Sequence, residues 1–147
     1  MARKVKRPEP QSDGTADDLT VLLPNRSLPI GGRTVTVREL GFFESLRLHA
    51  EIAALVSDLV EQTDDGNVDL ARLHRVCAQH PGATVALLAQ ASDQPVEWVR
   101  ALSAGHGDLL LLTFWAVNAD FFLQRVIAVL ELRRAAPATT GPASSPP

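Results

Sequence analysis

The sequence predicts a mostly helical α+β protein, in which a two- or three-stranded antiparallel β-hairpin unit precedes a bundle of about five helices. Two observations carry this prediction. Two β-prone segments flank a Gly-Gly pair near the N-terminus, and from residue 40 onward apolar residues recur at helical spacing. The 147 residues, 46% of them hydrophobic and 21% charged, are enough for one domain with a real core.

The single domain is expected at residues 18–134, between two disordered tails. Residues 1–17 form a basic, proline-containing tail, and residues 135–147 contain only Ala, Pro, Thr, Ser and Gly. Neither tail has enough apolar area to offset the entropy lost on ordering it.

The hairpin is predicted from the segments Leu28–Ile30 and Arg33–Val37, which flank Gly31 and Gly32. A two-residue type I′ turn needs positive φ at both central positions, and glycine adopts such angles readily. The threonines of the second segment are expected on one side and its valines on the other. The apolar run Leu19–Leu23 is a candidate third strand. So small a sheet is not stable alone, so it must pack on the helices.

Five helical segments follow, separated by turn-forming residues. The first spans residues 40–62, ends at the break Thr63–Asn67, and is followed by a helix for which Asn67 is a candidate N-cap. Pro81 and Gly82 end that helix, Ala83–Ala91 forms a short apolar one, and Pro95 starts another. Gly105–Gly107 breaks the chain again, and Asp108 caps a final helix that runs to about Arg134. The residues assigned to the apolar face of the first helix are Phe42, Phe43, Leu46, Ile52, Leu55, Val56, Leu59 and Val60.

The final helix is apolar over most of its circumference. Four of its polar residues fall on one narrow stripe: Thr113, Asp120, Gln124 and Glu131. Such a helix can be the buried centre of the bundle. It can also leave an apolar face for a partner or a second copy. One helix can do both. The stretch Leu109–Leu123 is too short and too polar to predict a membrane span.

Residues that could carry chemistry have simpler structural explanations, so we expect no catalytic residue, no metal site and no cofactor. His74, Cys77 and His80 spread around one helix and lack a fourth ligand for zinc. Asp64–Asp69 lacks the alternating spacing and closing Glu of a calcium loop. Gly105–Asp108 precedes a helix, but no cation follows that would help to bind phosphate. The sequence therefore predicts a protein that is not an enzyme.

The charge distribution disfavours nucleic acid as a partner. Four of the 14 basic residues lie in the first seven positions, so the rest of the chain, from residue 8 onward, contains 10 basic and all 17 acidic residues and is acidic. Duplex-binding domains usually present a basic face. A regulator that uses the short helices as a helix-turn-helix stays the least favoured alternative. Cys77 is the single cysteine, which excludes an internal disulfide and is consistent with a reducing cytoplasm.

Three segments resemble a known family. Ile30–Leu40 (IGGRTVTVREL) is similar to the opening of many bacteriophage tail-assembly chaperones, where a hairpin leads into a helix through a V-R-E-L entry. Val96–Leu102 (VEWVRAL) and Trp115–Leu123 (WAVNADFFL) resemble a pattern in small proteins of the tail-gene regions of Mu-like and related phages and prophages.

The resemblance implies a protein-binding assembly factor in the cytoplasm of the bacterial host cell. Its partner would be the tape-measure protein, kept soluble while tail-tube subunits, which are further candidate partners, assemble around it. A structural minor tail or connector protein is the main alternative, and a homo-oligomer stays open. No membrane partner is expected. The residues selected as partner-binding candidates are Trp98, Trp115, Phe121, Phe122, Val126 and Leu130.

Overall fold

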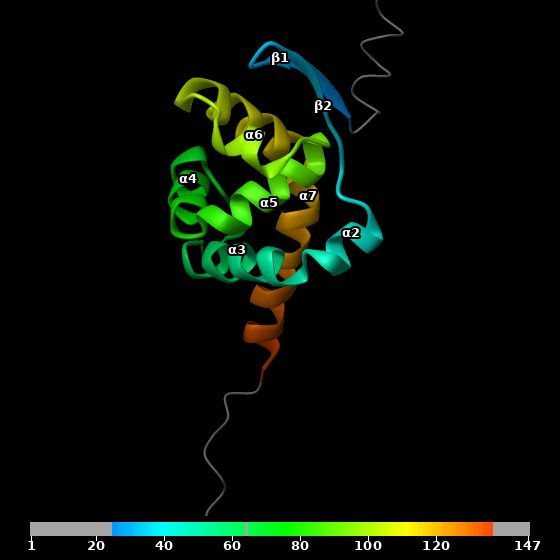
Figure 1. Cartoon of the computed structure of the whole chain (residues 1–147). Coiled ribbons are helices and arrows are strands. Elements are labelled where there is room, and N and C mark those ends of the chain that lie inside the picture. Colours follow the sequence, from blue (N-terminus) through cyan, green and yellow to red (C-terminus); the bar gives the residue numbers. More distant parts are fainter. Residues whose placement is uncertain (1–24, 64, 137–147) are drawn as a thin grey trace, which may run out of the picture.

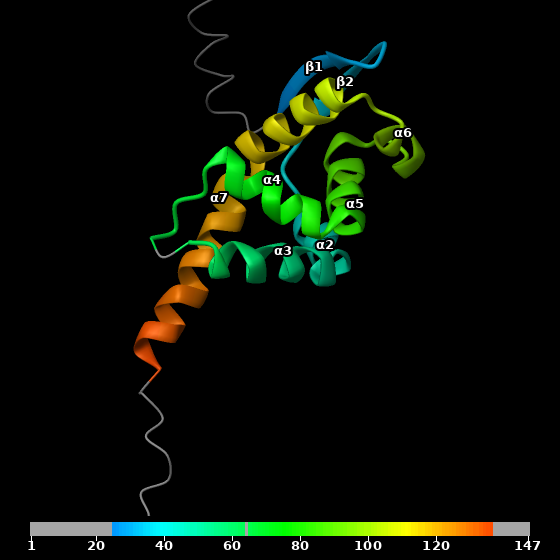
Figure 2. The ribbon, with the colours of Figure 1, turned by 90° about the vertical axis from the view of Figure 1, so that its left-hand side faces the viewer.

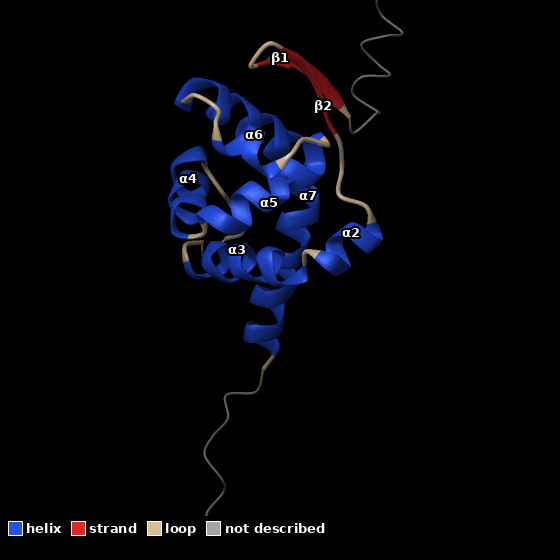
Figure 3. Cartoon of the chain, in the orientation of Figure 1, coloured by secondary structure: helices blue, strands red, loops and turns tan. Residues whose placement is uncertain are grey.

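The computed structural model describes residues 25–63 and 65–136 (Figure 1). A two-stranded antiparallel sheet is followed by helices, so the predicted mostly helical α+β class is confirmed (Figure 3). The candidate strand Leu19–Leu23, the whole predicted tail 1–17 and residues 137–147 of the other tail lie outside the described residues. The elements are β1 (Arg26–Ile30), β2 (Arg33–Val37), α2 (Phe42–Arg47), α3 (His49–Glu61), α4 (Leu70–Gln79), α5 (Pro81–Ser92), α6 (Val96–Arg100) and α7 (Ala104–Ala135).

The hairpin has the geometry predicted from its Gly-Gly turn. Its register runs from Arg26 opposite Val37 to Ile30 opposite Arg33, and Gly31 and Gly32 have φ angles of 57° and 77°. The two valines of β2 are fully buried and its two threonines are exposed. The hairpin therefore has one apolar face, which packs on the helical body.

Helix α7 is the axis of the fold. The hairpin lies against its N-terminal half, and α3 and α5 also contact it (Figure 2). Its buried residues follow one stripe at helical spacing: Leu110, Leu111, Phe114, Val117, Asn118, Phe122 and Val126. Beyond α3 its last turns project from the body (Figure 1). The helix is thus central along its first two thirds, while side chains such as Leu109 and Leu112 stay in part exposed.

The predicted first helix is in fact two helices. The chain bends at Leu48, whose φ and ψ of −95° and 22° are not helical, and α3 begins at the next residue. The apolar residues expected in the α3 part are buried, from Ile52 to Val60. No glycine or proline marks this bend, so the helical spacing of the apolar residues continues across it and predicts a single helix.

Three predicted helix starts were wrong, two of them because another residue supplies the cap. Asp69 caps α4 instead of Asn67, since its carboxylate accepts the Arg72 backbone N–H at 2.8 Å. Pro81 is the first residue of α5, where its missing N–H costs nothing. Helix α7 begins at Ala104, because the Ser103 hydroxyl accepts the backbone N–H of His106 at 3.3 Å.

Candidate functional site

Helix α2 presents three large apolar side chains to solvent. Phe42, Phe43 and Leu46 are 70%, 80% and 54% exposed, and the two phenyl rings meet edge to face with centroids 5.3 Å apart. Positions 42, 43 and 46 share one side of a helix, so these side chains form one continuous surface. We call these three residues the α2 apolar surface. Clustered aromatic groups of this kind mark contact sites for other proteins.

The exposure of this surface follows from the bend at Leu48. The sequence prediction placed Phe42, Phe43 and Leu46 on the buried face of one long helix, and that placement was wrong. Helix α2 does not continue the axis of α3 (Figure 1). A different side of α2 therefore faces the body, on which Ser45 is buried and Glu44 is half-buried. Ser45 is buried and its hydroxyl donates to the Phe42 carbonyl at 2.7 Å.

An ion-pair cluster holds α2 in this orientation. The Arg38 guanidinium donates to both carboxylate oxygens of Glu44, at 2.6 and 2.7 Å, and to both of Asp93, at 3.0 Å each. It also donates to the Gln90 carbonyl at 3.0 Å. Glu44 in turn accepts the backbone N–H of Gly41 at 2.9 Å, which closes the first turn of α2. Bidentate pairs of this kind fix geometry as well as charge, so α2 is attached firmly to the end of α5.

The cluster changes the proton affinities of its members. Hydrogen bonds from Arg38 lower the pKa of Glu44 to about 2, partly against the effect of burial. The same bonds, first to Glu44 and then to Asp93, raise the pKa of Arg38 above its ordinary value. Both groups are therefore charged across the physiological pH range.

This pKa predicts a loss of stability in acid that depends on Glu44. A carboxyl whose folded pKa lies below its unfolded value of about 4.3 stabilises the fold above that value, and the contribution disappears as the pH falls toward about 2. We expect Glu44→Gln to lower the free energy of unfolding by about 1 kcal/mol at pH 6, since the pair is a quarter exposed and partly screened. Urea unfolding of both proteins checks this, and a gap that stays constant down to pH 2 would contradict it.

Asn118 of α7 holds the linker between β2 and α2 in place through side-chain hydrogen bonds. Its side-chain oxygen accepts the Leu40 backbone N–H at 2.9 Å, and its NH₂ group donates to the carbonyls of Arg38 and Phe114, each at 3.2 Å. Asn118 is 1% exposed. The V-R-E-L and V-N segments of the sequence pattern therefore meet here, and their residues shape the fold that carries α2.

An open groove lies between the end of α2, the start of α3 and the α5–α6 turn. The Arg47 guanidinium spans part of it and donates to the Gln90 side chain. The lining is mixed, with small and apolar side chains between polar ones: Arg47, Leu48, Ala86, Ala89, Gln90, Asp93, Gln94, Pro95 and Val96. Arg47 and Leu48 line the groove and directly follow Leu46 in the chain, so the groove lies next to the α2 apolar surface.

Comparison with known proteins places the chain in a family. Residues 18–147 match the model of a family of unknown function, DUF6631. The chain belongs to DUF6631. The match begins at the residue where the domain was expected to start and spans the hairpin and all the helices described above. Neither the curated proteins nor the solved structures gave a match to this DUF6631 chain.

The six residues predicted to bind a partner are packing residues in this DUF6631 fold. Phe122 and Val126 are fully buried in the core, so they offer no surface to a partner. The other four are half-buried and pack against the core: Trp98, Trp115, Phe121 and Leu130. Trp98 lies beneath the hairpin turn, with the Arg33 guanidinium 5.4 Å from its ring centre. The residues selected from the sequence thus lie on α6 and α7, and none of them lies on α2.

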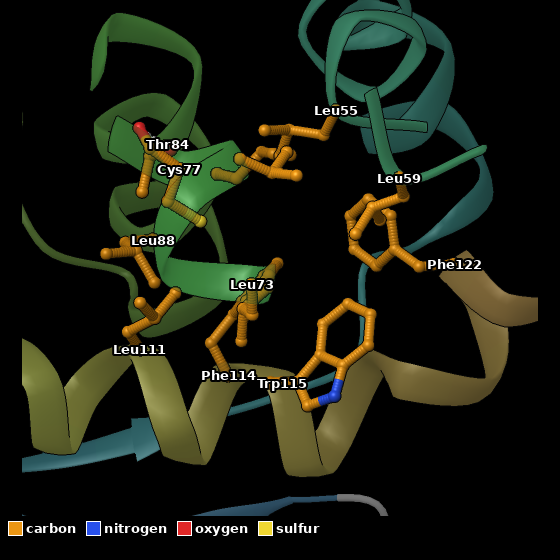
Figure 4. Close-up of a pocket in the computed structure, with 12 residues that line it drawn as sticks. Leu55, Leu59, Leu73, Cys77, Thr84, Leu88, Leu111, Phe114, Trp115 and Phe122 are labelled. Atoms are coloured by element: carbon orange, nitrogen blue, oxygen red, sulfur yellow. Dashed lines mark hydrogen bonds between the residues drawn. The ribbon is translucent and has the colours of Figure 1, made fainter. Parts of the chain in front are cut away.

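The core of the DUF6631 fold holds one apolar seam between α3, α4, α5 and α7 (Figure 4). Phe122, Trp115 and Leu59 lie at one end of it, and Leu88 and Leu111 lie at the other. Its free space is about 10 Å³, about the least that holds one water, and the exposed lining is entirely apolar. The seam is therefore packed core in this conformation.

His74 and Cys77 of α4 and His80, the residue after α4, have different neighbours. The His74 ring is 3.1 Å from Asp108 of α7, and the His80 ring is 2.5 Å from Asp58 of α3. Cys77 is buried, and burial raises the pKa of its thiol. No group of three or more His, Cys, Asp or Glu residues that could hold a metal ion occurs in residues 25–63 and 65–136.

Helix α7 is long and apolar enough to cross a membrane by length and composition alone. The sequence prediction on membrane spanning considered only the apolar stretch Leu109–Leu123 within the final helix, whereas the whole helix runs from Ala104 to Ala135 and has 32 residues. Thirty-two helical residues span about 48 Å. The DUF6631 fold buries one side of this helix against the hairpin, α3 and α5, which is also what the core helix of a globular protein does.

Proposed function

We propose that this protein is a non-enzymatic binding protein that shields an apolar segment of another protein during assembly. The observation that carries the proposal is the α2 apolar surface, two aromatic rings and a leucine held out to solvent on a firmly attached helix. Exposed apolar side chains on a fixed helix bind without the entropic cost of ordering that helix. A matching partner is an amphipathic helix or an extended apolar peptide that also lies in the neighbouring groove.

The specific role we propose is that of a tail-assembly chaperone for a phage tape-measure protein. The support is the resemblance in Ile30–Leu40 and Trp115–Leu123, together with an apolar binding surface outside the core. A tape-measure protein is long and aggregation-prone before the tube encloses it. A chaperone must bind it reversibly, and a small exposed surface suits reversible binding better than a large permanent interface.

Co-expression with the tape-measure protein of the same phage or prophage tests this proposal. We expect the tape-measure protein to move to the soluble fraction and to co-purify with the chain. Changing Phe42, Phe43 and Leu46 to serine is expected to weaken the complex about tenfold or more, since aromatic anchors dominate interface energies.

Leu132→Ser is the matched control. Leu132 is 70% exposed, as Phe42 is, but lies in the last turn of α7. That end of α7 projects from the body beyond α3 (Figure 1). It should leave binding unchanged. An insoluble tape-measure protein in the presence of the unmodified chain would refute the chaperone role, and equal loss in both variants would refute the site.

A second candidate is a minor tail or connector protein that stays in the virion. The exposed apolar residues along the outer side of α7, including Leu109, Leu112 and Ile127, favour it because a permanent symmetric interface could cover them. Mass spectrometry of purified particles separates the two roles. A chaperone is absent from finished particles, whereas a connector is present in a fixed copy number.

A further inference from the structure

Helix α7 carries a second apolar stripe on the side opposite its buried residues. Its members are spaced by three or four residues over about six turns, and we call them the α7 outer stripe: Leu109, Leu112, Ala116, Ala119, Leu123, Ile127 and Leu130. At 3.6 residues per turn these positions fall within an arc of about 80°. Leu109, Leu112 and Ile127 are 41%, 40% and 43% exposed. The outer stripe is therefore one continuous apolar surface about 32 Å long.

The described elements border the α7 outer stripe and leave it open. Ala116, near its middle, is exposed, and Leu123 and Leu130 are half-buried. The turn between α3 and α4 reaches Ile127 through Gly66, where an added Cβ would lie 3.3 Å from the Ile127 Cγ1 atom. Because glycine has no side chain, the isoleucine stays 43% exposed. Among the residues that the structure describes, this face of α7 is thus free to receive another helix.

The order of side chains along the outer stripe is nearly the same from either end. Read forward from Leu109 the side chains are Leu, Leu, Ala, Ala, Leu and Ile, and read backward from Ile127 they are Ile, Leu, Ala, Ala, Leu and Leu. Two antiparallel copies of the helix therefore match large residues with large ones and small with small. The facing pairs are Leu109 with Ile127, Leu112 with Leu123, and Ala116 with Ala119. A twofold interface requires such self-complementarity, since residue i contacts j while j contacts i.

The two alanines lie at the middle of this pairing. Their small side chains allow two helix axes to approach closely, and the larger side chains above and below them fill the space between the helices. The first five members follow the alternating spacing of three and four residues that is typical of paired helices. The shape of the stripe thus suits a helix of the same sequence in the opposite direction.

The polar residues beside the outer stripe are complementary in the same alignment. His106 and Glu131 lie on one flank of the stripe, and the antiparallel pairing brings the His106 ring level with the Glu131 carboxylate of the second copy. Thr113 is level with Gln124 in the same way, and each pair occurs twice by symmetry. A parallel pairing would instead place Glu131 beside Glu131 and Asp120 beside Asp120, and like charges at this position repel. Charge therefore favours the antiparallel arrangement.

We propose that a second copy of this chain packs antiparallel on the α7 outer stripe, so that the protein is a twofold dimer in solution. A second copy is the occupant because both the apolar stripe and its polar flank are self-complementary, a property that an unrelated partner does not need. Asn118, on the opposite side of α7, holds the linker to α2. The α2 apolar surface therefore stays outside the interface, and the dimer does not rest on the proposed function.

Sedimentation equilibrium of the full chain tests the dimer. We expect a dimer that dissociates in the micromolar range, since an interface on one helix lies at the small end of specific interfaces. Ala116→Arg is expected to weaken it tenfold or more, because it buries two unpaired charges at the closest approach of the helices. Ala128→Arg is the matched control. Ala128 is exposed and lies about 100° around the helix from Ile127, so its change should leave the dimer intact.

A chain that stays monomeric up to about 1 mM would overturn the proposal. So would equal weakening by the two arginine variants, because it would place the interface elsewhere. Both positions are exposed, so circular dichroism is expected to show the same fold in both proteins.

Disulfide cross-linking tests the direction of the pairing. In a Cys77→Ala background, a mixture of the Leu112→Cys and Leu123→Cys proteins should form disulfide-linked dimers under mild oxidation by glutathione. Either protein alone should not, because its two cysteines would be about 16 Å apart along the helices, and a disulfide needs Cα atoms within about 7 Å. Cross-linking of either protein alone, or none in the mixture, would overturn the antiparallel dimer.

Two carboxylates on the polar flank give a test in opposite directions. Asp120 lies near the twofold axis, where the two copies are offset by only about 6 Å along the helices and repel each other. Asp120→Asn is therefore expected to strengthen the dimer about twofold to threefold at low salt. Glu131→Gln should weaken it by a similar factor, since it loses the charge that faces His106. A change in the same direction in both variants would refute this alignment.

Discussion

Phe122→Ala is expected to lower the free energy of unfolding by about 4 kcal/mol, the usual cost of removing a fully buried phenylalanine. Phe122 is 1% exposed, and its ring is 5.1 Å from that of Phe121, 5.9 Å from that of Phe114 and 5.8 Å from that of Trp115. The surrounding helices α3 and α7 cannot collapse into the space without losing their other contacts. A domain at the lower end of ordinary stability, about 5 kcal/mol, would keep only about 1 kcal/mol.

Urea unfolding followed by circular dichroism measures this loss, and Phe43→Ala is the control. Phe43 is 80% exposed, so its truncation should change stability by less than about 0.5 kcal/mol. The pair separates the two uses of phenylalanine in this chain, one structural and one at the surface. Equal losses in the two variants would contradict the core position of Phe122.

Asn118→Leu is expected to cost about 3 kcal/mol, although it replaces a polar group in the core with an apolar one of similar size. The change removes the side-chain oxygen that accepts the Leu40 N–H and the NH₂ group that donates to the Arg38 carbonyl. Unpaired backbone groups lose their hydration without compensation. Because these groups lie in the linker that orients α2, the hairpin and α2 should loosen first.

Hydrogen exchange of the hairpin amides, together with urea unfolding, checks this prediction. Thr113→Val on the same helix is the control, since the Thr113 hydroxyl bonds only to the Leu109 carbonyl one turn earlier, at 2.8 Å. It should change stability by about 0.5 kcal/mol or less. An Asn118→Leu protein with unchanged stability would mean that water satisfies the linker groups.

The parts of the fold that sequence predicted were those in which one local signal decides the structure. The Gly31–Gly32 pair specifies the turn, and the turn fixes the strand register. The apolar period specifies the buried face of α3. The bend at Leu48 has no such signal, because tertiary contacts of α2 and α3 produce it. Gly105 and Gly107 indicated a break, but the Ser103 cap and the packing of α7 outweigh their cost within the helix.

The candidate site was missed for the same reason. A periodic pattern shows that Phe42, Phe43 and Leu46 share a side of a helix, but it does not show whether that side faces the core. The deciding contact is the Arg38 cluster, which joins residues 38, 44 and 93, and its three members are ordinary charged residues in the sequence. Large apolar side chains on α6 and α7 were therefore chosen instead, and the structure uses them for packing.

The bond between Leu40 and Asn118 also bears on how the chain is made. The two residues are 78 positions apart, and at 5–20 residues per second the ribosome needs about 4 to 16 s to make the intervening segment. Throughout that interval the newly made hairpin lacks the helix on which its valine face packs. A nascent chain released before residue 118 therefore exposes the apolar valine face of the hairpin, and a stalled or truncated product is expected to aggregate through the elements that are synthesised first.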